Sequence, residues 1–238
     1  MNNEWVSRFF QRSDPRTAEV LVPLPRTWWS RFYEYRWAQN FVHPQAVVLD
    51  AASGVSHPLK FWLGAHCAST FACDIDPRIQ SIDALSQELC NDLGVGDARR
   101  FLDIYLPAVR LIQASLLNLP YPDRFFDRIF CVSVLEHLSR DEQRQTFDEF
   151  QRTLKDDGLV IVTMDYPTVN LAYLQHTAQL CGLAFAGPVN FSSPPDALIS
   201  PDGRLKCFRA VLCHAEAKEA LNHGDQSGGG LWHSAGSD

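Results

Sequence analysis

Small and polar residues that could hold a ligand follow a short apolar run at residues 46–49. Residues 50–58 read Asp-Ala-Ala-Ser-Gly-Val-Ser-His-Pro. Small residues let the backbone turn tightly and approach a bound molecule, and a helix beginning near Pro58 would offer its free N–H groups to that molecule. The loop alone is equally consistent with a tight turn that binds nothing.

Asp74 is a second residue that could bind the same ligand as this loop. It follows a second apolar run at residues 69–73 and lies about 20 residues beyond Gly54, the spacing at which an acid accepts hydrogen bonds from ribose hydroxyls. Asp76, which precedes Pro77, is predicted to cap the next helix instead.

The elements that would position these residues alternate between strands and helices. Strands are predicted at 46–49, 69–73, 110–114, 128–132 and 159–163, and helices at about 58–63, 77–92, 140–154 and 169–181. Two late strands, near 183–191 and 206–214, are predicted to form an antiparallel hairpin. The pattern predicts an α/β fold with a doubly wound, seven-stranded, mostly parallel Rossmann-like sheet, whose ligand lies at the carboxyl ends of the strands.

Two later stretches make the pattern specific. Residues 118–123 read Asn-Leu-Pro-Tyr-Pro-Asp, with Phe-Asp following at 126–127, and residues 134–138 read Val-Leu-Glu-His-Leu. Together with Asp50 and the Asp-Ile-Asp at 74–76, they resemble the class I S-adenosylmethionine-dependent methyltransferase family, of the methyltransferase type 11 kind. The resemblance covers about residues 46–165.

The resemblance implies a binding site for S-adenosyl-L-methionine made of Asp50, Ala51, Ser53, Gly54, Asp74, Ile75, Ser115, Leu116 and Ser133. Asp50 would lie near the ligand ammonium, and Ala51, Ser53 and Gly54 would supply backbone contacts. Asp74 would bind the ribose and Ile75 the adenine face, while Ser115 and Leu116 would meet the adenine edge. Ser133 would lie near the methionine tail and the sulfonium.

The loop departs from the family at three points. Ala52 and Ser56 stand where the family usually has glycine, and Ser115 stands where it often has aspartate. His57 and Pro58 are also bulkier than the family loop. Alanine and serine are small enough to preserve the turn.

Residues 1–45 form a separate segment rich in aromatic residues and arginine, for which we predict two short helices. Trp28, Arg31 and Tyr33 are candidates for a lid that contacts the substrate. Arg31 or Arg26 could pair with a carboxylate, and Tyr33 or Tyr35 could contact the sulfonium or the acceptor. An amphipathic helix packed on the sheet with its rings in the core is an equally good interpretation.

His137 is a candidate general base because an imidazole titrates near neutral pH. A structural role at the start of a helix is the better supported interpretation of His137. The sequence contains no close cysteine pair of the kind that a structural zinc site uses, so no metal is expected.

Composition limits the classes of partner that we expect the protein to bind. The net charge is -7 and no long run of lysine and arginine occurs, which disfavours nucleic acid as a partner. No apolar run reaches the length that spans a bilayer. The seven cysteines mostly sit in apolar runs and read as buried thiols, and we expect a cytoplasmic protein. The domains predicted are a cap at 1–45, a methyltransferase core at 46–215 and a disordered tail at 216–238.

The function predicted is methyl transfer to a small molecule, a sugar or a natural-product intermediate. A nicotinamide-dependent oxidoreductase would need a Gly-x-Gly-x-x-Gly series, which is broken here. A non-catalytic protein that binds adenosylmethionine remains an alternative. Fold does not fix the methyl acceptor.

Overall fold

The protein was analysed as a computed structural model, which describes residues 3–218. The predicted tail at 216–238 therefore lies outside the described residues from 219 onward. In the described range, nine strands form one sheet: β1 (Ser7–Phe9), β4 (Val47–Ala51), β5 (Ser69–Asp74), β6 (Val109–Gln113), β7 (Phe126–Val132), β8 (Leu154–Tyr166), β9 (Leu183–Phe185), β10 (Val189–Asn190) and β11 (Lys206–His214). A small separate hairpin joins β2 (Glu19–Val20) to β3 (Val22–Pro23).

The strand order β10-β1-β11-β8-β7-β4-β5-β6, with β9 on β11, fixes where a ligand can bind. The strands from β4 to β8 are parallel, whereas β11 runs antiparallel to β8, β9 and β1. The chain moves outward from β4 to β6 and then returns to β7 on the other side of β4. The strand order therefore reverses between β4 and β7, the point at which such sheets bind their ligands.

Six α-helices and five 3-10 helices complete the described part. They are α1 (Arg31–Ala38), α2 (Leu59–His66), α3 (Ile82–Leu93), α4 (Ala98–Tyr105), α5 (Arg140–Thr153), α6 (Leu171–Leu180), η1 (Asn3–Trp5), η2 (Gln39–Phe41), η3 (Pro77–Gln80), η4 (Leu106–Ala108) and η5 (Leu135–His137). Side chains begin several of them: Ser139 and Glu142 form a capping box on α5, and Asp76 caps η3 as expected.

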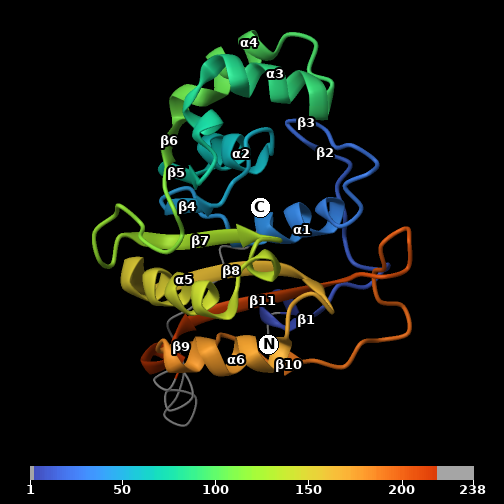
Figure 1. The fold of residues 1–238 in the computed structure, drawn as a ribbon, viewed down its shortest axis with the longest axis vertical. Helices are drawn as coiled ribbons and strands as arrows, with labels where there is room; N and C mark the ends of the chain where they lie inside the picture. Colours follow the sequence, from blue (N-terminus) through green and yellow to red (C-terminus); the bar gives the residue numbers. More distant parts are fainter. Residues whose placement is uncertain (1–2, 219–238) are drawn as a thin grey trace, which may run out of the picture.

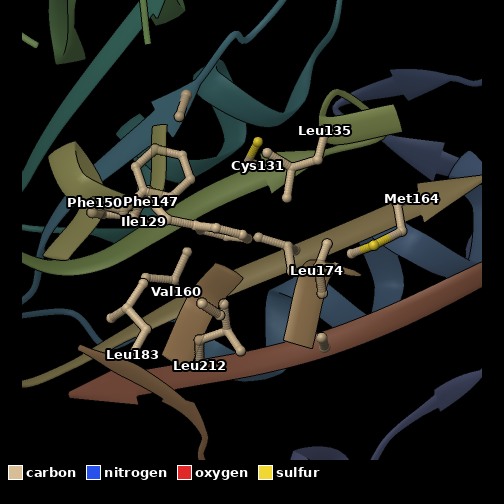
Figure 2. Close-up of a cluster of buried hydrophobic side chains, with 14 of the residues drawn as sticks. Ile129, Cys131, Leu135, Phe147, Phe150, Val160, Met164, Leu174, Leu183 and Leu212 are labelled. Carbon is tan, nitrogen blue, oxygen red and sulfur yellow. The ribbon is translucent and has the colours of Figure 1, made fainter. Parts of the chain in front are cut away.

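Successive strand residues point to opposite faces, and this alternation builds two cores. On one face Phe147 and Phe150 of α5 and Leu174 of α6 pack on Ile129 and Val160. Figure 2 shows these side chains meeting, and Figure 1 shows α5 and α6 together over this face. On the other face α1 and α2 cover Val48, Phe130 and Ile161, which lie on the central strands β4, β7 and β8.

The predicted fold class is confirmed, with differences in its elements. The five parallel strands lie where expected, but β8 begins at Leu154 rather than at residue 159, because Leu154 pairs with Phe126 ahead of an irregularity in the register. Helix α4 was not predicted. The sheet has nine strands rather than seven, since β1 and β10 extend its edge beyond β11.

The N-terminal segment differs most from expectation. It contributes the strand β1 to the sheet and one α-helix, α1, with short 3-10 turns, rather than two helices joined by a loop. β1 is only three residues long and pairs with residues about 200 positions away, so no local alternation could predict it.

Of the seven cysteines, five are buried, Cys67 is half-buried and Cys90 is exposed, and all seven are unpaired thiols. No helix in the range 3–218 is long and apolar enough to cross a membrane.

Phe9 tests whether β1 is an integral part of the sheet. Its ring is 1% exposed and makes edge-to-face contacts with Phe208 at 5.2 Å and Tyr166 at 5.3 Å between ring centroids. We expect Phe9→Ala to lower the free energy of unfolding by about 3–5 kcal/mol, because it removes a buried ring and leaves a cavity. Urea denaturation followed by circular dichroism measures this loss.

The control is Ile104→Ala on α4, where the side chain is 59% exposed and the cost should stay near 0.5 kcal/mol. A loss as small in Phe9→Ala as in this control would show that β1 is not packed as described.

Candidate functional site

A pocket lies at the point where the strand order reverses. It is lined by Asp50, Ala52, Ser53, Gly54, His57 and Leu59 from β4 and the following loop and helix, by Val132, Ser133 and Val134 after β7, and by Arg31 and Tyr35 of α1. Its volume is about 90 Å³, and the charged or polar side chains of Arg31, Tyr35 and Asp50 stand on its wall.

The loop after β4 takes the shape that the family achieves with glycine. Ala52 has φ +55° and Gly54 has φ +63°, both in the left-handed region. A Cβ at Gly54 would lie 2.6 Å from the His57 ring, so glycine is required there. Alanine at position 52 preserves the turn, as predicted, at some cost in backbone strain.

Asp74 fixes the loop to the end of β5. Its Oδ2 accepts a hydrogen bond from the Gly54 N–H at 2.8 Å and its Oδ1 accepts one from the Asp76 N–H at 2.9 Å. Each carboxylate oxygen retains a further lone pair, and the residue is partly exposed, so Asp74 can still accept bonds from a ligand.

The other residues predicted to meet the adenosine lie along the same edge of the sheet. Ile75 is 72% exposed, whereas Leu116 is 7% exposed. The Ser115 hydroxyl accepts from the Leu117 N–H at 3.2 Å, which shapes the turn after β6. Ala51, at the end of β4, is fully buried.

Asp50 is the most polar group on the pocket wall. It is 3% exposed, and its Oδ2 has no hydrogen-bond partner within residues 3–218. Burial raises the pKa of Asp50 to about 7, the nearby charge of Asp74 adds to the rise, and that of Lys60 opposes it. A buried carboxylate oxygen without a partner is costly unless a ligand satisfies it.

Arg31 faces the same pocket from α1. Its Nη1 donates to the Ser133 hydroxyl at 2.8 Å and pairs with the Glu34 carboxylate, while its Nε is buried without a partner in the part of the chain that the structure describes. Ser133 has φ +51°, and this places its hydroxyl between Arg31 and Glu34.

Glu34 connects α1 to the strands β8 and β11 and to the residue that follows β7. It is fully buried and accepts hydrogen bonds from Ser133 at 2.7 Å, Thr163 at 2.5 Å and the Cys207 thiol at 3.3 Å. Burial opposes its ionisation, but the charge of Arg31 and the bonds from Thr163 and Ser133 outweigh burial, so the pKa of Glu34 lies below its usual value.

Aromatic residues of the N-terminal segment cover the loop through His57. The Trp28 indole stacks on the His57 ring with centroids 4.3 Å apart, and the Tyr35 hydroxyl lies 2.6 Å from His57 Nδ1. Burial lowers the pKa of His57 to about 3, so the ring is neutral.

The structure places the three lid candidates differently. Arg31 lines the pocket, and Trp28 stacks on His57 of the loop. Tyr33 contacts neither: it is 6% exposed, packs near Phe10, and its hydroxyl lies 3.4 Å from the Arg12 carbonyl. Tyr35, two residues further along α1, lines the pocket.

A second pair of acids, Glu136 on η5 and Asp165 near the end of β8, stands outside the residues that line the pocket. Glu136 is 7% exposed; its Oε1 accepts from the Asp165 N–H at 2.9 Å, and its Oε2 has no partner among the described residues. Burial raises the pKa of Glu136 to about 8 and that of Asp165 to about 6. His137, the predicted base, is exposed on η5 and does not line the pocket.

The sequence did not indicate Lys60, Glu34 or the buried state of Glu136. Glu34 stands in a segment whose helical face has no clear apolar stripe, and Lys60 has the pattern of an ordinary surface lysine. Only three-dimensional contacts identify them, whereas Tyr35 was named from the sequence as the alternative to Tyr33. No group of three or more His, Cys, Asp or Glu side chains suited to a metal was found within the described range.

Comparisons with known proteins agree with this geometry. The sequence profile of the family described as "Methyltransferase domain" matches residues 49–162. A tRNA (carboxymethyluridine(34)-5-O)-methyltransferase of Arabidopsis thaliana is 28% identical over 121 residues, which is 50% of this chain and 24% of that protein. An uncharacterised protein of Methanocaldococcus jannaschii is 38% identical over 55 residues, 23% of each. The chain thus spans about a quarter of the length of these curated relatives.

A solved structure shares the fold. The Burkholderia thailandensis 1,6-didemethyltoxoflavin-N1-methyltransferase, with bound 1,6-didemethyltoxoflavin and S-adenosylhomocysteine, superposes with a TM-score of 0.54 at 15% identity, covering 79% of this chain and 81% of that one. Residues 49–162 thus match the methyltransferase domain family, and the strand order and the loop after β4 fit that match.

Glu34 allows a test of the buried network by pH. Because its pKa is depressed in the folded state, its ionisation stabilises the protein above the unfolded-state pKa of about 4.5, and this contribution is lost as pH falls through the folded value. We expect Glu34→Gln to lower the free energy of unfolding by about 3–5 kcal/mol at pH 7, since Arg31 is left without its carboxylate. Its loss of stability between pH 5 and pH 3 should be shallower than that of the wild type.

Glu88→Gln is the matched control, because Glu88 pairs with Arg78 at the surface and such pairs contribute at most about 1 kcal/mol. Equal effects of the two substitutions in urea titrations at pH 7 would contradict the buried network.

Proposed function

We propose that this protein binds S-adenosyl-L-methionine and transfers its methyl group to a small molecule. One observation carries the proposal: Asp50 and Arg31 line one pocket, and each has a buried polar atom without a partner in the residues described. An amino acid presents an ammonium and a carboxylate on one carbon. Asp50 would accept from the ammonium and Arg31 would donate to the carboxylate.

The rest of such a ligand has a path along the sheet. The pocket lies between β7 and β4, Asp74 ends β5 and Leu116 follows β6, and these strands are neighbours in that order. Adjacent strands lie about 4.8 Å apart, so the row spans about 15 Å. A nucleoside joined to an amino acid has a comparable extended length, which supports ribose binding by Asp74 and adenine binding by Ile75 and Leu116.

The bound cofactor would supply a methyl group on a positively charged sulfur. The protein then has to hold that methyl in line with an acceptor atom, and such positioning can contribute about 7–11 kcal/mol to lowering the barrier. Asp50 and Arg31 would fix one end and Asp74 the other. Trp28 and Tyr35, which both contact His57 of the loop, would cover the pocket and exclude water from it.

An acceptor that must lose a proton needs a base. Asp165 and Glu136 suit this role better than His137, because both carboxyl groups are buried or half-buried beside the loop after β7 and their raised pKa values fall near neutral pH. The His137 ring is exposed.

A small acceptor is favoured by charge. The net charge of -7 and the acids beyond the pocket would repel a phosphate backbone. The Burkholderia enzyme is bound to a small heterocycle, whereas the Arabidopsis relative is a tRNA methyltransferase. Incubation with labelled adenosylmethionine and either a metabolite extract or total tRNA decides between them: label in small molecules supports the proposal, and label in tRNA alone overturns it.

The cofactor half of the proposal predicts a pH-dependent affinity that depends on Asp50. Below about pH 7 Asp50 is protonated and cannot pair with an ammonium, so the affinity for S-adenosylhomocysteine should rise as pH increases through 7. Asp50→Asn should remove this rise and weaken binding at pH 8 by about 10- to 150-fold, the loss of a hydrogen bond to a charged group. Titration calorimetry measures both.

The matched ligand is 5′-methylthioadenosine, which shares the nucleoside but has no ammonium, and Asp50→Asn should leave its affinity unchanged. Binding of NAD without binding of S-adenosylhomocysteine would overturn the cofactor assignment. A protein that binds adenosylmethionine but methylates nothing in either extract would be the non-catalytic alternative.

A further inference from the structure

Lys60 lies in the first turn of α2 and is fully buried. Its Nζ donates to the carbonyl oxygens of Gly54 and His57, each at 2.7 Å, and lies 3.4 Å from that of Ser53. Three carbonyls of the loop after β4 therefore converge on one ammonium. An ammonium has three donors, so this arrangement uses its full hydrogen-bonding capacity.

The loop needs this support because it lacks most of the family glycines. Ala52 holds a left-handed conformation that its Cβ disfavours, and only Gly54 retains a glycine's freedom. Bonds from Lys60 to the carbonyls on both sides of residues 55 and 56 keep the turn closed. Asp74 supports the same loop separately, because its carboxylate accepts a hydrogen bond from the Gly54 N–H.

The charge of Lys60 acts on the two acids that the proposed function assigns to the cofactor. Asp50 on β4 and Asp74 on β5 both interact electrostatically with Lys60. The other charged or titratable groups that interact with this region are His57 in the loop, which is neutral, Arg31, Glu34 and Tyr35 on α1, and the buried thiols of Cys73 and Cys131. Lys60 is the positive charge on the α2 side, and Arg31 is the one on the α1 side.

A buried charge of this kind is expensive to fold, and a methionine or leucine would fill the space at lower cost. We propose that Lys60 is a positioning residue of the cofactor site: it holds the loop at residues 53–57 and keeps Asp50 ionised for the ammonium of the ligand. The proposal depends on the function proposed above, because it assigns Lys60 to that site.

The test compares Lys60→Met and Lys60→Gln with the wild type. Glutamine is neutral but retains two N–H donors for the loop carbonyls, so it isolates the charge, and it provides a second variant if the methionine form does not fold. Lys155→Met is the control. Lys155 lies on β8, away from the pocket, and its Nζ pairs with Asp127 Oδ1 at 2.8 Å. Circular dichroism and thermal unfolding establish which variants are folded.

Calorimetry with S-adenosylhomocysteine between about pH 6 and pH 8.5 gives the readout. Burial lowers the pKa of Lys60 to about 8, so the variants are compared with the wild type below about pH 7.5, where Lys60 keeps its charge. Removing the positive charge should move the midpoint of the affinity rise upward by about one pH unit, and at pH 6.5 this weakens binding by up to tenfold. Lys60→Met should also weaken 5′-methylthioadenosine, because the loop loses its bonds, whereas Lys60→Gln should affect that ligand less.

Wild-type affinity and an unmoved midpoint in a folded Lys60→Gln would overturn the proposal, as would the same change in Lys155→Met. Failure of the wild-type protein to bind S-adenosylhomocysteine is a different result, which overturns the proposed function itself.

Discussion

The buried carboxylate of Glu34 joins the N-terminal segment to the sheet at the edge where a ligand can bind. Its partners are Arg31 on its own helix, Ser133 after β7, Thr163 on β8 and Cys207 on β11. An ionised group at this depth is stable only with such a complete set of donors. The position of α1 over the strand ends therefore depends on Glu34, and so does the guanidinium that α1 brings to the pocket.

Charge compensation extends from this network to the other side of the pocket. Arg31 balances Glu34 on the α1 side, and Lys60 balances Asp50 and Asp74 on the α2 side. Between them lie Asp50 Oδ2 and Arg31 Nε, the two buried atoms of this wall without partners among the described residues. Two opposite unsatisfied groups at one switch point are what an amino-acid end of a ligand would complete.

Much of the core could be predicted because its signals are local. Each parallel strand is a short apolar run, and Asp50, Gly54 and Asp74 follow such runs at a recognisable spacing. The capping role of Asp76 could likewise be predicted from Pro77, the residue that follows it. The family resemblance added the adenosine contacts, which the structure brings to one edge of the sheet but does not test.

The N-terminal contribution could not be predicted because it depends on distant partners. Nothing near Glu34 in the sequence indicates that Thr163 or Cys207 will meet it, and Tyr33 and Tyr35 differ in role only through the direction in which each side chain leaves the helix. Lys60 was hidden for the same reason: its three partners are backbone carbonyls, which every sequence contains.

One ligand that occupies the loop after β4 together with the segment above it would shield both from solvent. Hydrogen exchange measured by mass spectrometry, with and without S-adenosylhomocysteine, detects such shielding. We predict that the ligand slows exchange both at residues 50–57 and at residues 28–37, and leaves α5 and α6 unchanged. Protection of the loop with no change at 28–37 would make the N-terminal segment a scaffold only. Unchanged exchange at both segments would contradict the account of the site.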